Sequence, residues 1–321
     1  MKTAPKQLLK TVLPIAFGIF LVWYSYNSTS GEDRRQILHY IKGADLFWVL
    51  LSILIGILSH LSRAIRWGYL LRPMGHRPKT SNTVLIILLA YFANLGIPRS
   101  GELLRATALT TYEGVPFEKG FGTIVTERII DLIMLLAVVF TALLLQTDII
   151  MEVLLQKGFD LEKLFMLAGI GFVGLLSFLI FLKKAKNKWA IKIKVFAKGL
   201  LEGLLSIFKM KNKWGFIFHT VFIWTAYFAM FWVIKYTLPE IADLSVSQLL
   251  VPFVAGAFAM SATNGGIGLY PIAVSSSLAF FGISDASGDA FGWIMWISQT
   301  LMVVVFGAIS FLLLPLLNRN Q

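Results

Sequence analysis

The chain has 321 residues, of which 57% are hydrophobic and only 14% are charged, and its mean hydropathy is +0.76. This composition excludes a soluble globular protein and predicts an all-α polytopic membrane protein. The net charge of +12 lies mostly beside apolar segments, so it indicates membrane topology and anionic headgroups, and we expect no nucleic-acid partner. The absence of cysteine excludes disulfides, thiolate nucleophiles and cysteine metal sites.

Six apolar segments are long enough to cross a bilayer as helices. In chain order they are residues 8–24, 44–61, 121–145, 165–182, 214–234 and 291–317. The first segment follows three lysines, as in a signal peptide, but no convincing small-residue cleavage site comes after it. We therefore predict an uncleaved first span. The short charged stretch 31–42 predicts a surface helix before the second span.

Two further apolar regions, 84–95 and 249–262, are too short to cross the membrane. Each ends in a polar, glycine-containing stretch, and another short apolar piece, 271–281, follows the second. We predict two re-entrant hairpins with similar tips at 94–98 and 264–268. One hairpin follows the second span and the other follows the fifth, which predicts an inverted repeat with broken helices, as in transporters.

Loop charges predict the orientation. The loop 63–79 is basic, 146–163 is mainly acidic, and 183–213 contains ten lysines but only one acid. The positive-inside rule places the first and third of these loops in the cytoplasm and the second outside. This requires both hairpins to re-enter, and it puts both termini in the cytoplasm of a single domain, 1–321. The segment 183–213 also predicts an amphipathic helix bound to anionic lipids.

Three charged residues lie within the third predicted span: Glu127, Arg128 and Asp131. Glu127 and Asp131 are four residues apart and therefore share one helix face. Ionised groups at bilayer depth are costly and are rarely without a partner or a task. The two interpretations are a polar cavity that binds or couples a substrate and an internal ion pair that holds helices together.

The second span ends in two arginines, Arg63 and Arg66, which also share a face. They either neutralise a phosphate that enters from the cytoplasm or act as interfacial anchors whose side chains reach the membrane surface.

The first hairpin carries five candidate binding residues, Asn94, Pro98, Arg99, Glu102 and Arg105. Proline suits a helix N-terminus, where free N–H groups and the helix dipole attract an anion. The guanidinium fork of Arg99 matches a phosphate, and the last three residues can share one helix face. The alternative is a polar cytoplasmic loop with solvated charges.

The second hairpin is uncharged and contributes Asn264, Gly265, Gly266 and Tyr270 as candidates. Glycines and a proline this close together predict unwound backbone, whose polar groups need partners within a membrane. The alternative is a plain outer loop. The chain has no nucleotide-binding signature and no metal-ligand spacing of histidines, so we assign no cofactor, metal or catalytic residue.

The motifs Arg63-x-x-Arg66-Trp67, Pro98-Arg99-x-Gly101-Glu102, Glu127-Arg128-x-x-Asp131 and Gly265-Gly266-Ile267-Gly268 together resemble the lysylphosphatidylglycerol synthase transmembrane region family. Its best-known members are the multiple peptide resistance factors, and the resemblance covers nearly the whole chain. It implies a flippase-like module of a bacterial inner membrane. The sequence ends at Gln321, directly after the last predicted span, and does not contain the soluble aminoacyl transferase domain of those factors. We therefore expect no enzyme activity. The lipid need not be lysylated.

Three functions fit these features. The first is a translocase that moves a phospholipid or lipid-linked precursor between leaflets, with a homo-oligomer possible. The second is a membrane enzyme or accessory protein that acts on a lipid phosphate, with Glu127 and Asp131 as the plausible carboxylate pair. The third is a secondary transporter of a small anion.

Overall fold

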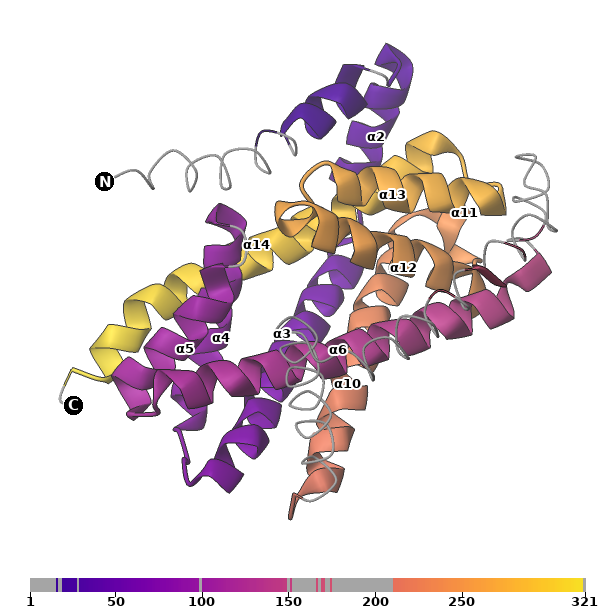
Figure 1. Ribbon diagram of the computed structural model, residues 1–321. Helices are drawn as coiled ribbons and strands as arrows, with labels where there is room; N and C mark the ends of the chain where they lie inside the picture. The colour runs from indigo at the N-terminus through magenta and orange to yellow at the C-terminus, as the bar shows by residue number, and fades with distance from the viewer. Residues whose placement is uncertain are drawn as a thin grey trace.

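The computed structural model describes residues 19–27, 29–97, 100–148 and 210–319, together with isolated positions at 16, 151, 166, 169, 170 and 174. The described elements are α-helices and short 3-10 turns, and no strand occurs among them (Figure 1). This confirms the all-α polytopic fold.

Four described helices are long and apolar enough to cross a membrane. They are α3 (Leu46–Leu71), α6 (Phe117–Leu145), α10 (Lys213–Ile234) and α14 (Asp285–Leu317). They correspond to four of the six predicted spans, and α2 (Gly31–Gly43) is the predicted surface helix. The other two predicted spans, 8–24 and 165–182, and the lysine-rich segment 183–213 lie largely outside the described ranges.

The spanning helices are longer than their predicted apolar windows. Helix α3 continues to Leu71 instead of ending at residue 61, and α14 begins at Asp285 instead of residue 291. Hydropathy underestimated α3 because its last turns carry arginines. Those arginines are paired with acidic side chains of other helices, so the charged turns remain inside the fold.

Both predicted hairpins are present as pairs of short helices. The first consists of α4 (Thr80–Gly96) and α5 (Ser100–Glu113), and the second of α12 (Val246–Ala262) and α13 (Leu269–Leu278). Helices α4 and α12 have 17 residues each. At 1.5 Å per residue they are about 25 Å long, which is less than the hydrocarbon thickness of about 30 Å.

The helices pack as an inverted repeat predicts. Helices α3 and α10 lie side by side and run in opposite directions, since Ser52 contacts Met230 and Ser62 contacts His219. Helix α4 packs on α14 and α12 packs on α6, so each hairpin is held by the last helix of the other half (Figure 1). Each hairpin also packs on its own half, through α5 on α6 and through α13 on α14.

The tips of the two hairpins meet. A Cβ atom added to Gly265 would lie 3.0 Å from Cδ2 of Leu95 at the end of α4. The indole of Trp296 on α14 donates a 2.8 Å hydrogen bond to the carbonyl oxygen of Gly265. The tip of the second hairpin is therefore held both by α14 and by the end of α4.

Glycines on α14 allow both hairpins to pack closely. A Cβ at Gly292 would lie 2.7 Å from Cα of Pro271 in α13. At Gly307 the Cβ would collide with Cβ of Phe92 in α4. Helix α14 therefore carries the second hairpin on its N-terminal half and the first on its C-terminal half.

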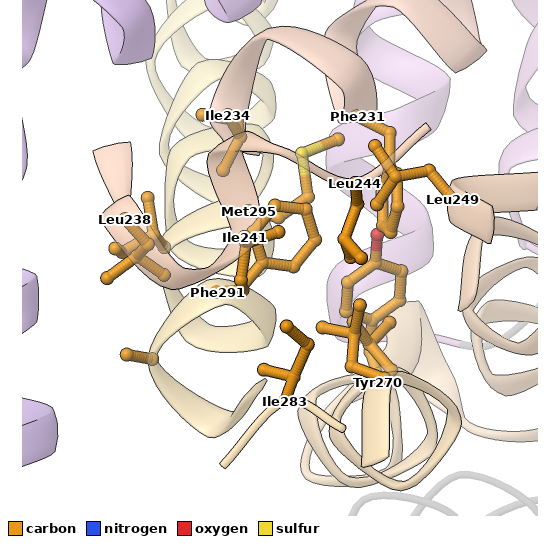
Figure 2. Packing of buried hydrophobic residues seen from close by; sticks show 14 of the residues in the cluster. Phe231, Ile234, Leu238, Ile241, Leu244, Leu249, Tyr270, Ile283, Phe291 and Met295 are labelled. Carbon is orange, nitrogen blue, oxygen red and sulfur yellow. The ribbon is translucent and has the colours of Figure 1, made fainter. Parts of the chain in front are cut away.

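The largest apolar core surrounds the second hairpin (Figure 2). Phe231 of α10 and Phe291 of α14 are fully buried, with ring centroids 4.8 Å apart in an edge-to-face contact. Tyr270 of α13 belongs to the same core, and its ring fills the space left by Gly256 of α12. This close packing holds the second hairpin rigidly against α10 and α14.

Polar contacts tie both hairpins down at their open ends. Asn82 at the start of α4 and Asn318 after α14 exchange two amide hydrogen bonds, and Glu113 at the end of α5 accepts another from Asn82. At the opposite end, Glu240 accepts hydrogen bonds from the backbone and hydroxyl of Ser284. Burial acts to raise the pKa of the Glu240 carboxyl, but hydrogen bonds from Ser287 and Ser284 outweigh this effect and lower the pKa.

The predicted orientation can be measured by cysteine labelling, since the chain has no cysteine of its own. A cysteine replacing Thr147, after α6, is expected to react with an impermeant thiol reagent in intact cells. A cysteine replacing Met74, after α3, is expected to react only after the cells are opened. Both positions are exposed, so accessibility within the fold does not decide the result. The reverse labelling pattern would contradict the orientation.

Candidate functional site: a buried arginine and carboxylate cluster

The charged residues of α3, α5 and α6 form one cluster. Helix α3 runs antiparallel to α6, so successive turns of one face successive turns of the other. The i, i+3 spacing of Arg63 and Arg66 places both guanidinium groups opposite the i, i+4 pair Glu127 and Asp131. The predictions of a shared face on α3 and on α6 are both confirmed by these contacts.

Glu127 forms the innermost part of the cluster. Its carboxylate is fully buried and accepts hydrogen bonds from Arg105 of α5 at 2.6 Å and from Arg66 of α3 at 3.3 Å. The Arg105 guanidinium also lies over the Trp67 ring, 4.2 Å from its centroid. Glu127 thus joins three helices. Of the two interpretations of these carboxylates, its geometry matches the internal ion pair.

Asp131 forms the second part. It accepts hydrogen bonds from Arg63 at 2.7 Å and from Arg66 at 3.0 Å. Its side chain is 12% exposed, whereas that of Glu127 is 0% exposed. Arg63 and Arg66 are themselves almost completely buried, which excludes the interpretation that they are interfacial anchors. The greater exposure makes Asp131 the more accessible of the two carboxylates.

An ion pair between α5 and α6 forms the accessible edge of the cluster. Glu102 and Arg128 lie 3.2 Å apart, with side chains 25% and 43% exposed. Arg128 also lies 3.9 Å from Asp131, so the accessible pair is continuous with the buried residues. A polar group that approaches between these helices would meet Arg128 first.

The cluster has an excess of positive charge. Four arginines, Arg63, Arg66, Arg105 and Arg128, face only three carboxylates, Glu102, Glu127 and Asp131. The buried Nε atoms of the first three arginines have no hydrogen-bond partner among the described residues. Unsatisfied buried donors are costly, and an excess cation within a membrane favours an anionic partner.

Helix α10 supplies two further partners that the sequence interpretation missed. Arg63 donates to the hydroxyl of Tyr227 at 3.1 Å, and Arg66 donates to that of Thr220 at 3.3 Å. The sequence does indicate these partners, because residues 220 and 227 are about two helical turns apart on one face of a largely apolar span. A further hydrogen bond joins α3 to α6: the indole of Trp67 donates to Thr123 at 2.8 Å.

One tip residue of the first hairpin, Asn94, makes a contact within the hairpin itself. The side chain of Asn94 accepts a 2.7 Å hydrogen bond from the backbone N–H of Gly101, so it caps the start of α5. This contact occupies one of the N–H groups that we expected to face an anion. Pro98 and Arg99 lie outside the described residues. Glu102 and Arg105 do share a face, since both reach α6.

The second hairpin has the unwound backbone that its glycines predict. Gly265, Gly266 and Gly268 have φ values of 64°, 75° and 72°, a region that favours glycine. Gly265 contacts the first hairpin, whereas Tyr270 is buried in the apolar core and makes no described contact with the arginines. The side chain of Asn264 lies outside the described parts of the chain. Among those parts, no group of three or more acidic or histidine side chains is arranged to hold a metal ion.

The fold and this cluster define a polytopic helical membrane protein with two broken-helix hairpins and a buried cluster of charges. The family model for the lysylphosphatidylglycerol synthase TM region matches residues 11–310, and the chain belongs to this family. No solved structure matches the chain significantly.

Curated relatives match the chain over shorter stretches. Glycosyltransferase AglD of Haloferax volcanii is 28% identical over 127 residues, which are 39% of this chain and 19% of that protein. UPF0104 membrane proteins of Methanocaldococcus jannaschii and Methanothermobacter thermautotrophicus are 28% and 25% identical over 123 and 130 residues. These stretches cover 37% and 40% of this chain, and 35% of each relative.

Proposed function

We propose that the protein moves a phosphate-bearing lipid between the leaflets of its membrane. The observation that carries this proposal is the buried cluster with one more arginine than carboxylates. A lipid headgroup that carries a phosphate would supply the missing negative charge. The acyl tails would remain in the bilayer while the headgroup passes along the cluster.

The arrangement of the cluster supports exchange of partners. Asp131 accepts one hydrogen bond from each of Arg63 and Arg66, and its side chain is partly exposed. A phosphate can replace a carboxylate at a guanidinium, because both accept two parallel N–H groups. The headgroup would enter past Arg128 and compete with Asp131, while Glu127 keeps the helices together.

The meeting of the two hairpins also supports transport. Inverted repeats with broken helices place the binding site near the middle of the bilayer, and alternating access follows from movement of one repeat against the other. In this chain the hairpin tips touch through Gly265 and Leu95. Each hairpin packs on the long helix of the other half, so motion of one half is transmitted to the other.

The test is reconstitution into liposomes that contain a fluorescent phosphatidylglycerol. We expect the wild-type protein to move this lipid between leaflets, as measured by chemical quenching of the outer leaflet. Arg63→Lys keeps the charge but loses the fork that bridges Asp131 and Tyr227. The rate of lipid movement by this variant is expected to fall about tenfold or more, because the loss of one hydrogen bond to a charged group raises the barrier by at least that factor. Movement no faster than in protein-free liposomes would reject the proposal.

A second candidate function is action on a lipid phosphate, either as an enzyme or as an accessory to one. It is favoured by the similarity to the Haloferax volcanii relative, a glycosyltransferase, although the matched stretch is 19% of that protein. Turnover of a polyprenyl-phosphate substrate by the purified chain, without lipid movement, would support this candidate instead.

A further inference from the structure

A second polar site lies at the end of α3 that we predict to be cytoplasmic. A cavity of about 640 Å³ opens there between the end of α3, the start of α4 and the turn that precedes α10. It is separate from the buried cluster, because none of the seven clustered charged residues lines it. Its polar lining comprises Tyr69, Arg72, Arg77, Thr80, Thr83, Lys211 and Asn212.

The charges of this cavity all have the same sign. Arg72, Arg77 and Lys211 line it, and no carboxylate is present among the described lining residues. Three cations around one hollow concentrate a positive field and favour an anion with several charges. The hydroxyls of Thr80 and Thr83 add hydrogen-bonding groups at its wall.

The cavity leads toward the buried cluster through two aromatic side chains. Tyr69, which lines the cavity, has its ring centroid 5.8 Å from that of His219 on α10. His219 in turn shares a 2.7 Å hydrogen bond with Ser62, one residue before Arg63. Tyr69 and His219 therefore connect the cavity wall to α3 at Ser62, about one helical turn before Arg66.

We propose that this cavity is the loading site, where the phosphate of a lipid headgroup binds before it reaches the buried cluster. This inference rests on the proposed translocation. The cavity lies at the level where a headgroup of the predicted cytoplasmic leaflet would be, and its apolar wall, including Ala64 and Ile65, suits the glycerol and first carbons of the tails. Movement of Tyr69 away from His219 would then admit the headgroup to the arginines.

One position allows the cavity to be blocked without a change of charge. Gly68 lines the cavity, and a Cβ placed there meets no atom within 4 Å. Gly68→Leu is therefore compatible with the fold of α3 and also places a better helix former there. Its side chain would occupy space that the headgroup needs. General attraction of anionic lipids to basic loops would not be affected.

The test is a lipid titration of the purified full chain in neutral detergent, followed by thermal unfolding. A ligand that binds the folded state raises the unfolding temperature in a concentration-dependent way. We would titrate phosphatidylglycerol, diacylglycerol and inorganic phosphate into the wild type, Gly68→Leu and the double variant Arg72→Gln/Arg77→Gln. The matched control is Arg319→Gln, an exposed arginine after α14 that does not line the cavity.

We expect stabilisation by phosphatidylglycerol but not by diacylglycerol or inorganic phosphate. The double variant should need a higher lipid concentration, by about fivefold for each cation removed. Gly68→Leu should weaken binding at least as much, and Arg319→Gln should match the wild type. The inference is overturned if Gly68→Leu binds normally, if Arg319→Gln is weakened equally, or if inorganic phosphate stabilises as well as the lipid does.

This titration is independent of transport. If the wild type binds lipid through the cavity but moves none in liposomes, the cavity is a binding site for lipid phosphate, and both translocation and the loading role are rejected. If the protein moves lipid while the cavity variants bind normally, the loading site alone is rejected.

Discussion

Replacement of Glu127 by glutamine is expected to lower the free energy of unfolding by about 3–5 kcal/mol, the cost of leaving buried charges without their partner. The carboxylate is fully buried between Arg66 and Arg105, so its removal leaves two guanidinium groups with too little negative charge around them. The measurement is thermal and denaturant unfolding of the purified protein in detergent.

Two variants complete this experiment. Glu118→Gln on the same helix is the matched control, because Glu118 is exposed, and it should unfold like the wild type. The double variant Glu127→Gln/Arg105→Gln should recover part of the lost stability, since it removes a cation together with its partner. Equal unfolding temperatures for Glu127→Gln and Glu118→Gln would show that the buried ion pair does not hold the three helices together.

Asp131→Asn is expected to have its main effect on transport. Asp131 is partly exposed and bridges Arg63 and Arg66 with one hydrogen bond from each, so its neutralisation leaves both cations for an anionic headgroup. A translocating site must bind strongly enough to load but weakly enough to release. We therefore expect tighter lipid binding, with transport slowed about tenfold or more, the size of one lost charge-assisted hydrogen bond.

Three measurements on the same preparations test this. They are lipid movement in liposomes, the lipid concentration that stabilises the protein, and the unfolding temperature without lipid. The fall in stability should be smaller than for Glu127→Gln. A variant that loses stability but keeps the wild-type rate per folded molecule would make Asp131 a structural residue, and the headgroup site would then have to be sought elsewhere.

The two carboxylates of α6 illustrate what a sequence leaves open. Their spacing was enough to place Glu127 and Asp131 on one face, because helix periodicity is a local property. It did not distinguish an ion pair from an accessible site, since that depends on neighbours far away in the chain. Arg66 and Arg105 come from other helices, and they enclose Glu127 completely while leaving Asp131 partly exposed.

The two hairpins also combine features that the sequence predicts with features that only the tertiary structure shows. Apolar length and glycine content predict that the runs 84–95 and 249–262 stop within the membrane, because they are too short to cross about 30 Å of hydrocarbon. By contrast, only the tertiary structure showed that the tips meet and that Asn94 caps α5.

The sequence by itself thus determined the class of protein, the broken helices and the charged residues at membrane depth, since each follows from local composition and helix geometry. The tertiary structure decided which arginine pairs with which carboxylate, how much each is exposed, and that Tyr227 and Thr220 of α10 complete the site. These features depend on the packing of α3 against α6 and α10, and that packing joins residues far apart in the chain.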